Sequence, residues 1–215
     1  MTLGTFDYAK ELICRQLNMK QDESEKGQGL RELQAAYHGG VYFRIPSGVL
    51  LAGLLTNESP PDAIPVLKEL RQELPESPFI HIVYVTALYN AGQIPDMERE
   101  AADFLVKAES GPYVGYKPQA YFAEGLLAFR REKWADAAAS FHRASDSGPE
   151  ENPYTTWSML YEGYCYDALG ERAKAKERYE AVVARKPRYA SHERAKMRLD
   201  SPFKRTDVEM RKVEL

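Results

Sequence analysis

Apolar residues recur along most of the chain at the three- and four-residue spacing of an amphipathic α-helix. The alternating pattern typical of strands is absent from the sequence, apart from an ambiguous apolar run at 79–85. Proline, glycine and capping residues interrupt the helical pattern at regular intervals. The pattern predicts helices over 4–18, 29–39, 46–57, 61–74, 78–91, 94–108, 117–131, 134–147, 154–169, 171–185 and 189–199. The expected fold class is therefore all-α.

Two polar segments lack an apolar face and are expected to lie outside regular helices. Residues 21–29 are interpreted as a mobile link, and 201–215 as a loose tail or a helix that needs a partner. These segments predict N-terminal helices over 1–40, a helical repeat domain with a terminal capping helix over 41–199, and a polar C-terminal tail over 200–215.

Two neighbouring pairs of predicted helices share a pattern that recurs after 38 residues. Each pair contains a glycine, an alanine, an aromatic residue and a proline: Gly125, Ala137, Phe141 and Pro149 in the first, Gly163, Ala175, Tyr179 and Pro187 in the second. The small residues would let the two helices of a pair approach closely, and the aromatic ring would fill the space beside them. Tandem helix pairs at such a spacing are typical of a helical solenoid.

These residues resemble the tetratricopeptide repeat family, whose pattern is W-x₂-L-G-x₂-Y, A-x₃-F and P. The glycines, the alanine–aromatic pairs, the prolines and Tyr166 match the pattern, clearly over 117–187 and more weakly over 46–110. Glu124 and Glu162 stand where the family has leucine. The resemblance implies a right-handed α-α superhelix, a tetratricopeptide-like solenoid of helix-turn-helix repeats.

In this family the first helix of each repeat lines a concave groove that usually holds a peptide or helix of a partner. The resemblance implies an apolar and aromatic groove formed by Phe79, Ile82, Tyr89, Phe122, Leu126, Phe129, Trp157, Leu160, Tyr161 and Tyr164. Such a groove suits an apolar segment or an amphipathic helix. Two alternatives stay open: the same side chains are core residues, or a terminal helix such as 4–18 fills the groove.

The two glutamates in leucine positions also have two interpretations. Glu124 and Glu162 either form a series of inward-facing acids that binds a cationic partner, or they reach solvent or a neighbouring Tyr or Arg. A buried carboxylate without a compensating group would be costly, so a buried glutamate must have such a partner.

Motifs for catalysis, phosphate binding and metal binding are absent from the sequence, including G-x-S-x-G, the P-loop and H-E-x-x-H. The four histidines are isolated, and Cys14 and Cys165 form no C-x-x-C pair. We therefore expect no catalytic residue, no metal site and no cofactor. The expected function is a non-catalytic scaffold for protein–protein interaction.

Charge is unevenly distributed, although the formal net charge is only −3. Residues 171–215 carry 14 Lys and Arg against 8 Asp and Glu, and the rest of the chain is acidic. The alternative function is therefore a self-assembling structural protein, in which the acidic body of one copy meets the basic C-terminal end of the next.

The same composition narrows the partners and the compartment. The small net charge argues against nucleic-acid binding, and no apolar stretch is long enough to span a membrane. No secretory signal is visible in residues 1–20. The expectation is a cytoplasmic protein, monomeric or homo-oligomeric, whose partner is a protein or peptide.

Overall fold

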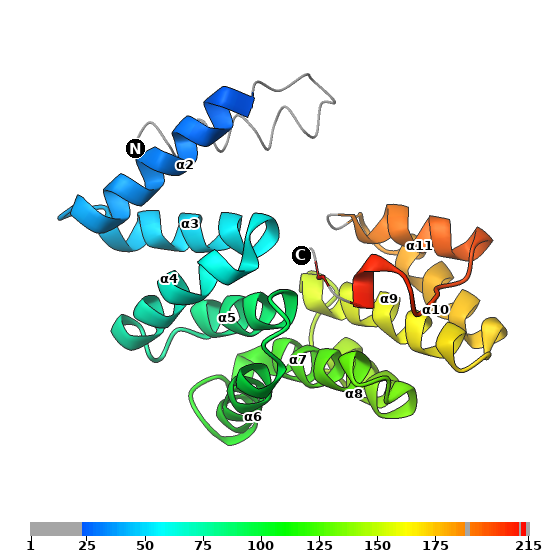
Figure 1. Ribbon diagram of the computed structural model, residues 1–215. Helices are drawn as coiled ribbons and strands as arrows, with labels where there is room; N and C mark the ends of the chain where they lie inside the picture. Colours follow the sequence, from blue (N-terminus) through cyan, green and yellow to red (C-terminus); the bar gives the residue numbers. More distant parts are fainter. Residues whose placement is uncertain (1–22, 188–189, 211, 214–215) are drawn as a thin grey trace. The chain divides into compact units, whose positions relative to one another are not determined.

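The computed structural model describes residues 23–187, 190–210 and 212–213 (Figure 1). These residues form ten α-helices and two short 3₁₀ helices, and no strand occurs among them. The expected all-α class is confirmed. Across the described part of the chain, every helix is too short or too polar to cross a bilayer.

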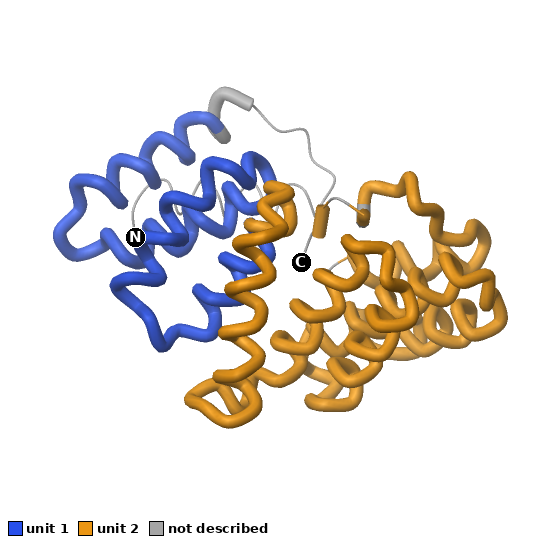
Figure 2. The backbone as a smooth tube through the Cα atoms, turned by 60° about the horizontal axis from the view of Figure 1, so that its bottom comes forward, with its two compact units in different colours: residues 1–87 blue, residues 88–215 orange. Residues whose placement is uncertain are grey.

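The chain forms two compact units, which divide within helix α5 between Ala87 and Leu88 (Figure 2). The first unit contains α2 (Glu23–Gly39), α3 (Arg44–Glu58), α4 (Pro60–Glu73) and most of α5 (Pro78–Asn90). The second contains α6 (Ile94–Ser110), η1 (Val114–Tyr116), α7 (Lys117–Arg130), α8 (Trp134–Asp146), α9 (Pro153–Ala168), α10 (Arg172–Ala184), α11 (Ser191–Asp200) and η2 (Val208–Met210). The divisions predicted from the sequence lie near residues 40 and 200.

The nine helices predicted from residue 46 onward agree with the structure to within two residues at each end. The link predicted at 21–29 is wrong over its described part, because α2 begins at Glu23. The first turns of α2 lack apolar residues, which begin at Leu30. Gln28 donates a hydrogen bond of 3.0 Å to Glu32, one turn later, and such a pair stabilises this part of the helix. The helix predicted at 4–18 lies outside the described residues.

Helices of the second unit differ in how many of their sides are buried. Every residue of α9 from Thr155 to Cys165 is buried, and α7 is buried nearly as fully. In α10, by contrast, burial is confined to one stripe: Ala175, Tyr179 and Val182. Each helix packs against the next one along the chain, from α7 to α11. A helix that is apolar on several sides is thus covered by neighbours on several sides.

Two glycines allow aromatic rings to lie directly against a helix backbone. A Cβ atom at Gly125 would lie 2.6 Å from ring atoms of Phe141, and one at Gly163 would lie 2.3 Å from the ring of Tyr179. Both rings are fully buried, as are Ala137 and Ala175. The contacts between α7 and α8 and between α9 and α10 therefore need glycine at these two places.

Three turns of the second unit have the same backbone geometry. The turns after α5, α7 and α9 each contain one residue with positive φ: Gly92 at 72°, Glu132 at 56° and Gly170 at 79°. In each turn the next N–H donates to the carbonyl five residues earlier: Gln93 to Leu88 at 2.9 Å, Lys133 to Ala128 at 3.0 Å and Glu171 to Tyr166 at 2.8 Å. This is the hydrogen bond of a Schellman motif, and it recurs after 40 and 38 residues.

The segment that follows α11 packs against the second unit. Phe203, Met210 and Val213 are buried, and residues 208–210 form the 3₁₀ helix η2. The interpretation of 201–215 as a loose tail is therefore wrong for the described residues of this segment.

Candidate functional site

The side chains predicted to line a groove are mostly buried within the unit to which they belong. In the second unit the eight predicted residues are fully buried: Tyr89, Phe122, Leu126, Phe129, Trp157, Leu160, Tyr161 and Tyr164. Their rings pack on one another, with centroids 5.6 Å apart for Phe122 and Tyr161 and 5.3 Å apart for Phe129 and Tyr161. In the first unit Ile82 is buried, whereas Phe79 is 55% exposed. In this form a partner cannot reach most of these side chains.

Two of these buried rings contact the C-terminal segment, by which we mean the described residues between 201 and 213, that is 201–210, 212 and 213. The ring of Phe203 stacks on Tyr164, with centroids 4.9 Å apart and planes 19° apart. It also lies 5.5 Å from Phe129 and 6.5 Å from Trp134, measured between ring centroids. The Arg198 guanidinium lies 5.6 Å from the centre of the Phe203 ring. These four side chains form an aromatic slot around Phe203.

Asp167, near the end of α9, fixes the backbone beside this slot. Its side chain is 1% exposed, and its Oδ2 accepts hydrogen bonds from the Phe203 N–H at 2.8 Å and the Tyr179 hydroxyl at 2.7 Å. Arg172 donates to both carboxylate oxygens, at 2.9 and 3.1 Å. These donors compensate for the burial of the carboxylate. Burial and the bond to Asp167 raise the pKa of Tyr179 above its ordinary value, so its hydroxyl remains a donor.

Charged groups hold the turn that follows Phe203. Arg198 pairs with Asp207 at 2.8 Å, and Asp207 also accepts the N–H of Lys204 at 2.7 Å. Arg205 lies 5.4 Å from the centre of the Trp134 ring and pairs with Glu132 at 3.3 Å. The turn thus lies beside the loop between α7 and α8.

Two side chains at helix ends bind the backbone of the far part of the segment. Arg130, the last residue of α7, donates to the carbonyl of Met210. Asn90, the last residue of α5, donates to the carbonyl of Val213 at 3.0 Å and accepts its N–H at 2.7 Å. A side-chain amide that makes both bonds recognises the N–H and C=O groups of the bound residue, which do not depend on that residue's side chain.

We call Asn90, Phe129, Arg130, Trp134, Tyr164, Asp167 and Arg198 the segment-binding surface. Except for Arg198, on α11, and Trp134, the first residue of α8, these residues lie at or near the C-terminal ends of α5, α7 and α9. The surface supplies one aromatic slot and three side chains that bind main-chain groups. This arrangement suits the binding of an irregular polypeptide segment.

Sequence reasoning missed Asn90, Arg130 and Asp167, because their roles depend on residues far along the chain. Asn90 lies at the end of the predicted helix 78–91, and its partner Val213 is 123 residues away. A signal was present for Phe203, which is the only aromatic residue in the polar segment after Asp200.

The second glutamate in a leucine position is buried among compensating groups. Glu162 is 1% exposed, and its oxygens lie 3.4 Å from His142 and 3.8 Å from Arg178. It also accepts a hydrogen bond of 3.1 Å from the Tyr166 hydroxyl. Burial raises the pKa of Glu162, and the nearby Arg178 and His142 partly offset this effect.

Glu124 has partners of the same kind. It accepts hydrogen bonds from Ser140 at 3.0 Å and from Arg143 at 3.3 Å. Both glutamates therefore agree with the second interpretation, in which each carboxylate has a partner within the chain.

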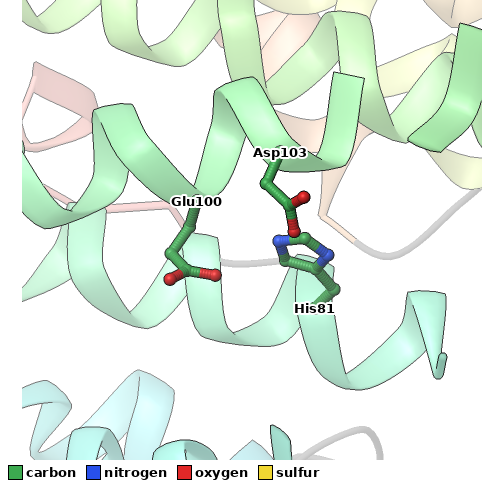
Figure 3. A group of neighbouring side chains, drawn as sticks. All are labelled: His81, Glu100 and Asp103. Atoms are coloured by element: carbon green, nitrogen blue, oxygen red, sulfur yellow. The ribbon is translucent and has the colours of Figure 1, made fainter. Parts of the chain in front are cut away.

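Figure 3 shows His81 on α5 and the two carboxylates of Glu100 and Asp103 on α6. The carboxylates lie near cations of their own helix, with Asp103 3.1 Å from Lys107 and Glu100 4.0 Å from Arg99. His81 is buried and belongs to the first unit, whereas both acids belong to the second. We assign no metal site to these residues.

Comparisons with protein-family models, with curated proteins and with solved structures found no match to this chain. The resemblance to tetratricopeptide repeats therefore depends on the sequence pattern. The three equivalent turns and the glycine–ring contacts are consistent with a repeated structure.

Proposed function

We propose that the protein is a non-catalytic scaffold, a solenoid of the tetratricopeptide type that binds a polypeptide segment of a partner. The repeated turns and the glycine–ring contacts of the second unit support this architecture. The observation that carries the function is the binding of main-chain groups by Asn90, Arg130 and Asp167. These side chains extend from the C-terminal ends of α5, α7 and α9, which are every second helix along the chain. The proposed site therefore takes one residue from each successive helix pair.

The site differs from the aromatic groove that the sequence predicted. Most of the predicted aromatic side chains form the core, and the partner would meet the ends of the helices instead. Its apolar contribution is one aromatic side chain in the slot between Tyr164, Phe129 and Trp134. Buried aromatic anchors of this kind carry much of the energy of protein interfaces.

A library of displayed random peptides, selected on the full chain, tests this function. We expect the selected peptides to contain an aromatic residue and to bind the Asn90→Ala and Arg130→Ala variants about tenfold more weakly than the wild type. Arg99→Ala is the matched control, since Arg99 is exposed and pairs with Asp96 on its own helix. Selected peptides that bind all four proteins equally would contradict the proposal.

The alternative, head-to-tail self-assembly through charge, has less support. Three arginines of the basic C-terminal end already pair with acids of their own unit: Arg172 with Asp167, Arg198 with Asp207 and Arg205 with Glu132. These arginines would have to give up their intramolecular partners to bind an acidic neighbour.

A further inference from the structure

We infer that the C-terminal segment is an intramolecular ligand of the segment-binding surface, which must leave before a partner's segment binds in its place. This inference rests on the proposed function, and it adds that the C-terminal segment competes with the partner for the same surface. The partner would present an irregular segment with an aromatic side chain in the slot and main-chain groups near Arg130 and Asn90.

The segment is held at a few points, as a bound peptide is. Between its anchors, the side chains of residues 204–206 and of Val208 are exposed. The anchors are the Phe203 ring, the buried side chains of Met210 and Val213, and the main-chain groups of these three residues. Asp207 adds an ion pair with Arg198. A different sequence could therefore satisfy the same surface, provided that it supplies an aromatic ring, apolar side chains at the two far anchors and the backbone groups.

The surface is built largely by residues outside the segment. Phe129 packs edge-on against Trp134, with centroids 5.3 Å apart, and Tyr164 packs edge-on against Tyr161 at 5.0 Å. Asp167 also accepts hydrogen bonds from Arg172 and Tyr179, two donors that lie outside the segment. The slot and its hydrogen-bond acceptor are thus pre-organised, which favours binding.

The covalent connection explains why the segment occupies the surface. Only Ser201 and Pro202 separate Asp200, the end of α11, from Phe203. A short connection gives a tethered ligand a high effective concentration. A partner therefore competes with a local ligand, and weakening that ligand should strengthen binding of the partner.

A labelled synthetic peptide of residues 201–213 provides a direct test by fluorescence anisotropy. We expect the full-length Phe203→Ala variant to bind this peptide about tenfold or more tightly than the wild type, because its own segment has lost the aromatic anchor. A control peptide with alanine at the Phe203 position should bind neither protein. Adding Asn90→Ala to the variant should weaken binding of the original peptide. Equal binding by the wild type and Phe203→Ala, or no binding by either, would overturn the inference.

Amide hydrogen exchange of the wild type tests the same inference without a substitution. If the segment detaches while the unit stays folded, the amides of Phe203 and Val213 exchange faster than the core amides of α7 and α9. Exchange of these two amides only at the rate of the α9 core would show that the segment is part of the folded unit, and would refute a ligand role.

The two proposals can fail separately. Library peptides that depend on Arg130, together with equal peptide binding by the wild type and Phe203→Ala, would support the scaffold function and refute the intramolecular ligand. Binding of the 201–213 peptide by Phe203→Ala, with no Asn90-dependent library peptide, would support the ligand and contradict a general peptide-binding function.

Discussion

At the scale of single residues, Glu132 occupies a turn position whose backbone conformation favours glycine. It occupies the left-handed position of the turn after α7, where the two equivalent turns have Gly92 and Gly170. Among described non-glycine residues it alone has a positive φ. A side chain in this conformation is strained by contacts with its own backbone. Glu132 does contribute a pair with Arg205, so the position serves the C-terminal segment as well.

Replacing Glu132 separates these two effects. Glu132→Gly and Glu132→Ala both lose the pair with Arg205, but only glycine relieves the strain. We expect the glycine variant to have a free energy of unfolding about 1 kcal/mol above that of the alanine variant, measured by urea denaturation. Equal stability of the two variants would contradict the strain argument.

Glu162 gives a prediction for pH dependence. Because burial raises its pKa above the ordinary value of 4.5, the folded protein holds this proton more tightly than the unfolded chain. The contribution of Glu162 to stability therefore falls as the pH rises from 4.5 through the raised pKa. The glutamine of Glu162→Gln cannot titrate. We therefore expect the free energy of unfolding of this variant, relative to that of the wild type, to rise as the pH increases over this range.

Urea denaturation at a series of pH values measures this difference. Glu177→Gln is the control, because Glu177 is 69% exposed on the neighbouring α10. A stability difference between Glu162→Gln and the wild type that does not change with pH, or that shrinks as pH rises, would contradict the prediction.

At the scale of elements, the second unit depends on close approach between paired helices. The ring of Tyr179 fills the space that a side chain at Gly163 would need, and Phe141 does the same at Gly125. Ala137 and Ala175, which recur with the glycines in the sequence, are fully buried on α8 and α10. The turns after α7 and α9 then return the chain in the same way in each pair.

Gly163→Ala tests this packing. We expect a loss of about 1–3 kcal/mol in the free energy of unfolding, because the new Cβ overlaps a buried ring that has little room to move. Gly53→Ala, in α3, is the control: a Cβ atom at Gly53 would meet no neighbouring side chain within 4 Å, so better helix propensity should leave stability unchanged or raised. A Gly163→Ala protein with the melting temperature of the wild type would show that the contact is not tight.

At the scale of the whole molecule, the question is whether the segment-binding surface and the basic end act within one chain or between chains. The observed pairs of Arg198 and Arg205 lie within one unit. These intramolecular pairs involve the same charges that self-assembly would use. Ion pairs between copies at a partly exposed surface would be weak and screened by salt.

Sedimentation velocity at low and at high salt tests this at the level of the intact protein. We expect the mass of a single chain under both conditions. Association at low salt that dissolves at high salt would favour the self-assembling alternative. Association that resists salt and disappears in Phe203→Ala would indicate that the C-terminal segment is exchanged between copies, and would contradict an intramolecular ligand.

The sequence by itself determined the all-α class, the helix positions from residue 46 onward and the glycines that the rings of Phe141 and Tyr179 require. These features follow from local periodicity and from the size of neighbouring side chains. It did not determine the start of α2, where the Gln28–Glu32 pair rather than an apolar face supports the helix, or the burial of the predicted groove.

Only the tertiary structure decided what covers the aromatic slot. Phe203 reaches an acceptor 36 residues away, Met210 a donor 80 residues away and Val213 an asparagine 123 residues away. A periodic pattern tells which face of a helix is buried, but it holds no information on which distant segment buries it. The four hydrogen bonds to main-chain groups of the segment are a further reason. Every residue except proline offers the same N–H and C=O groups, so these bonds leave no mark in the sequence.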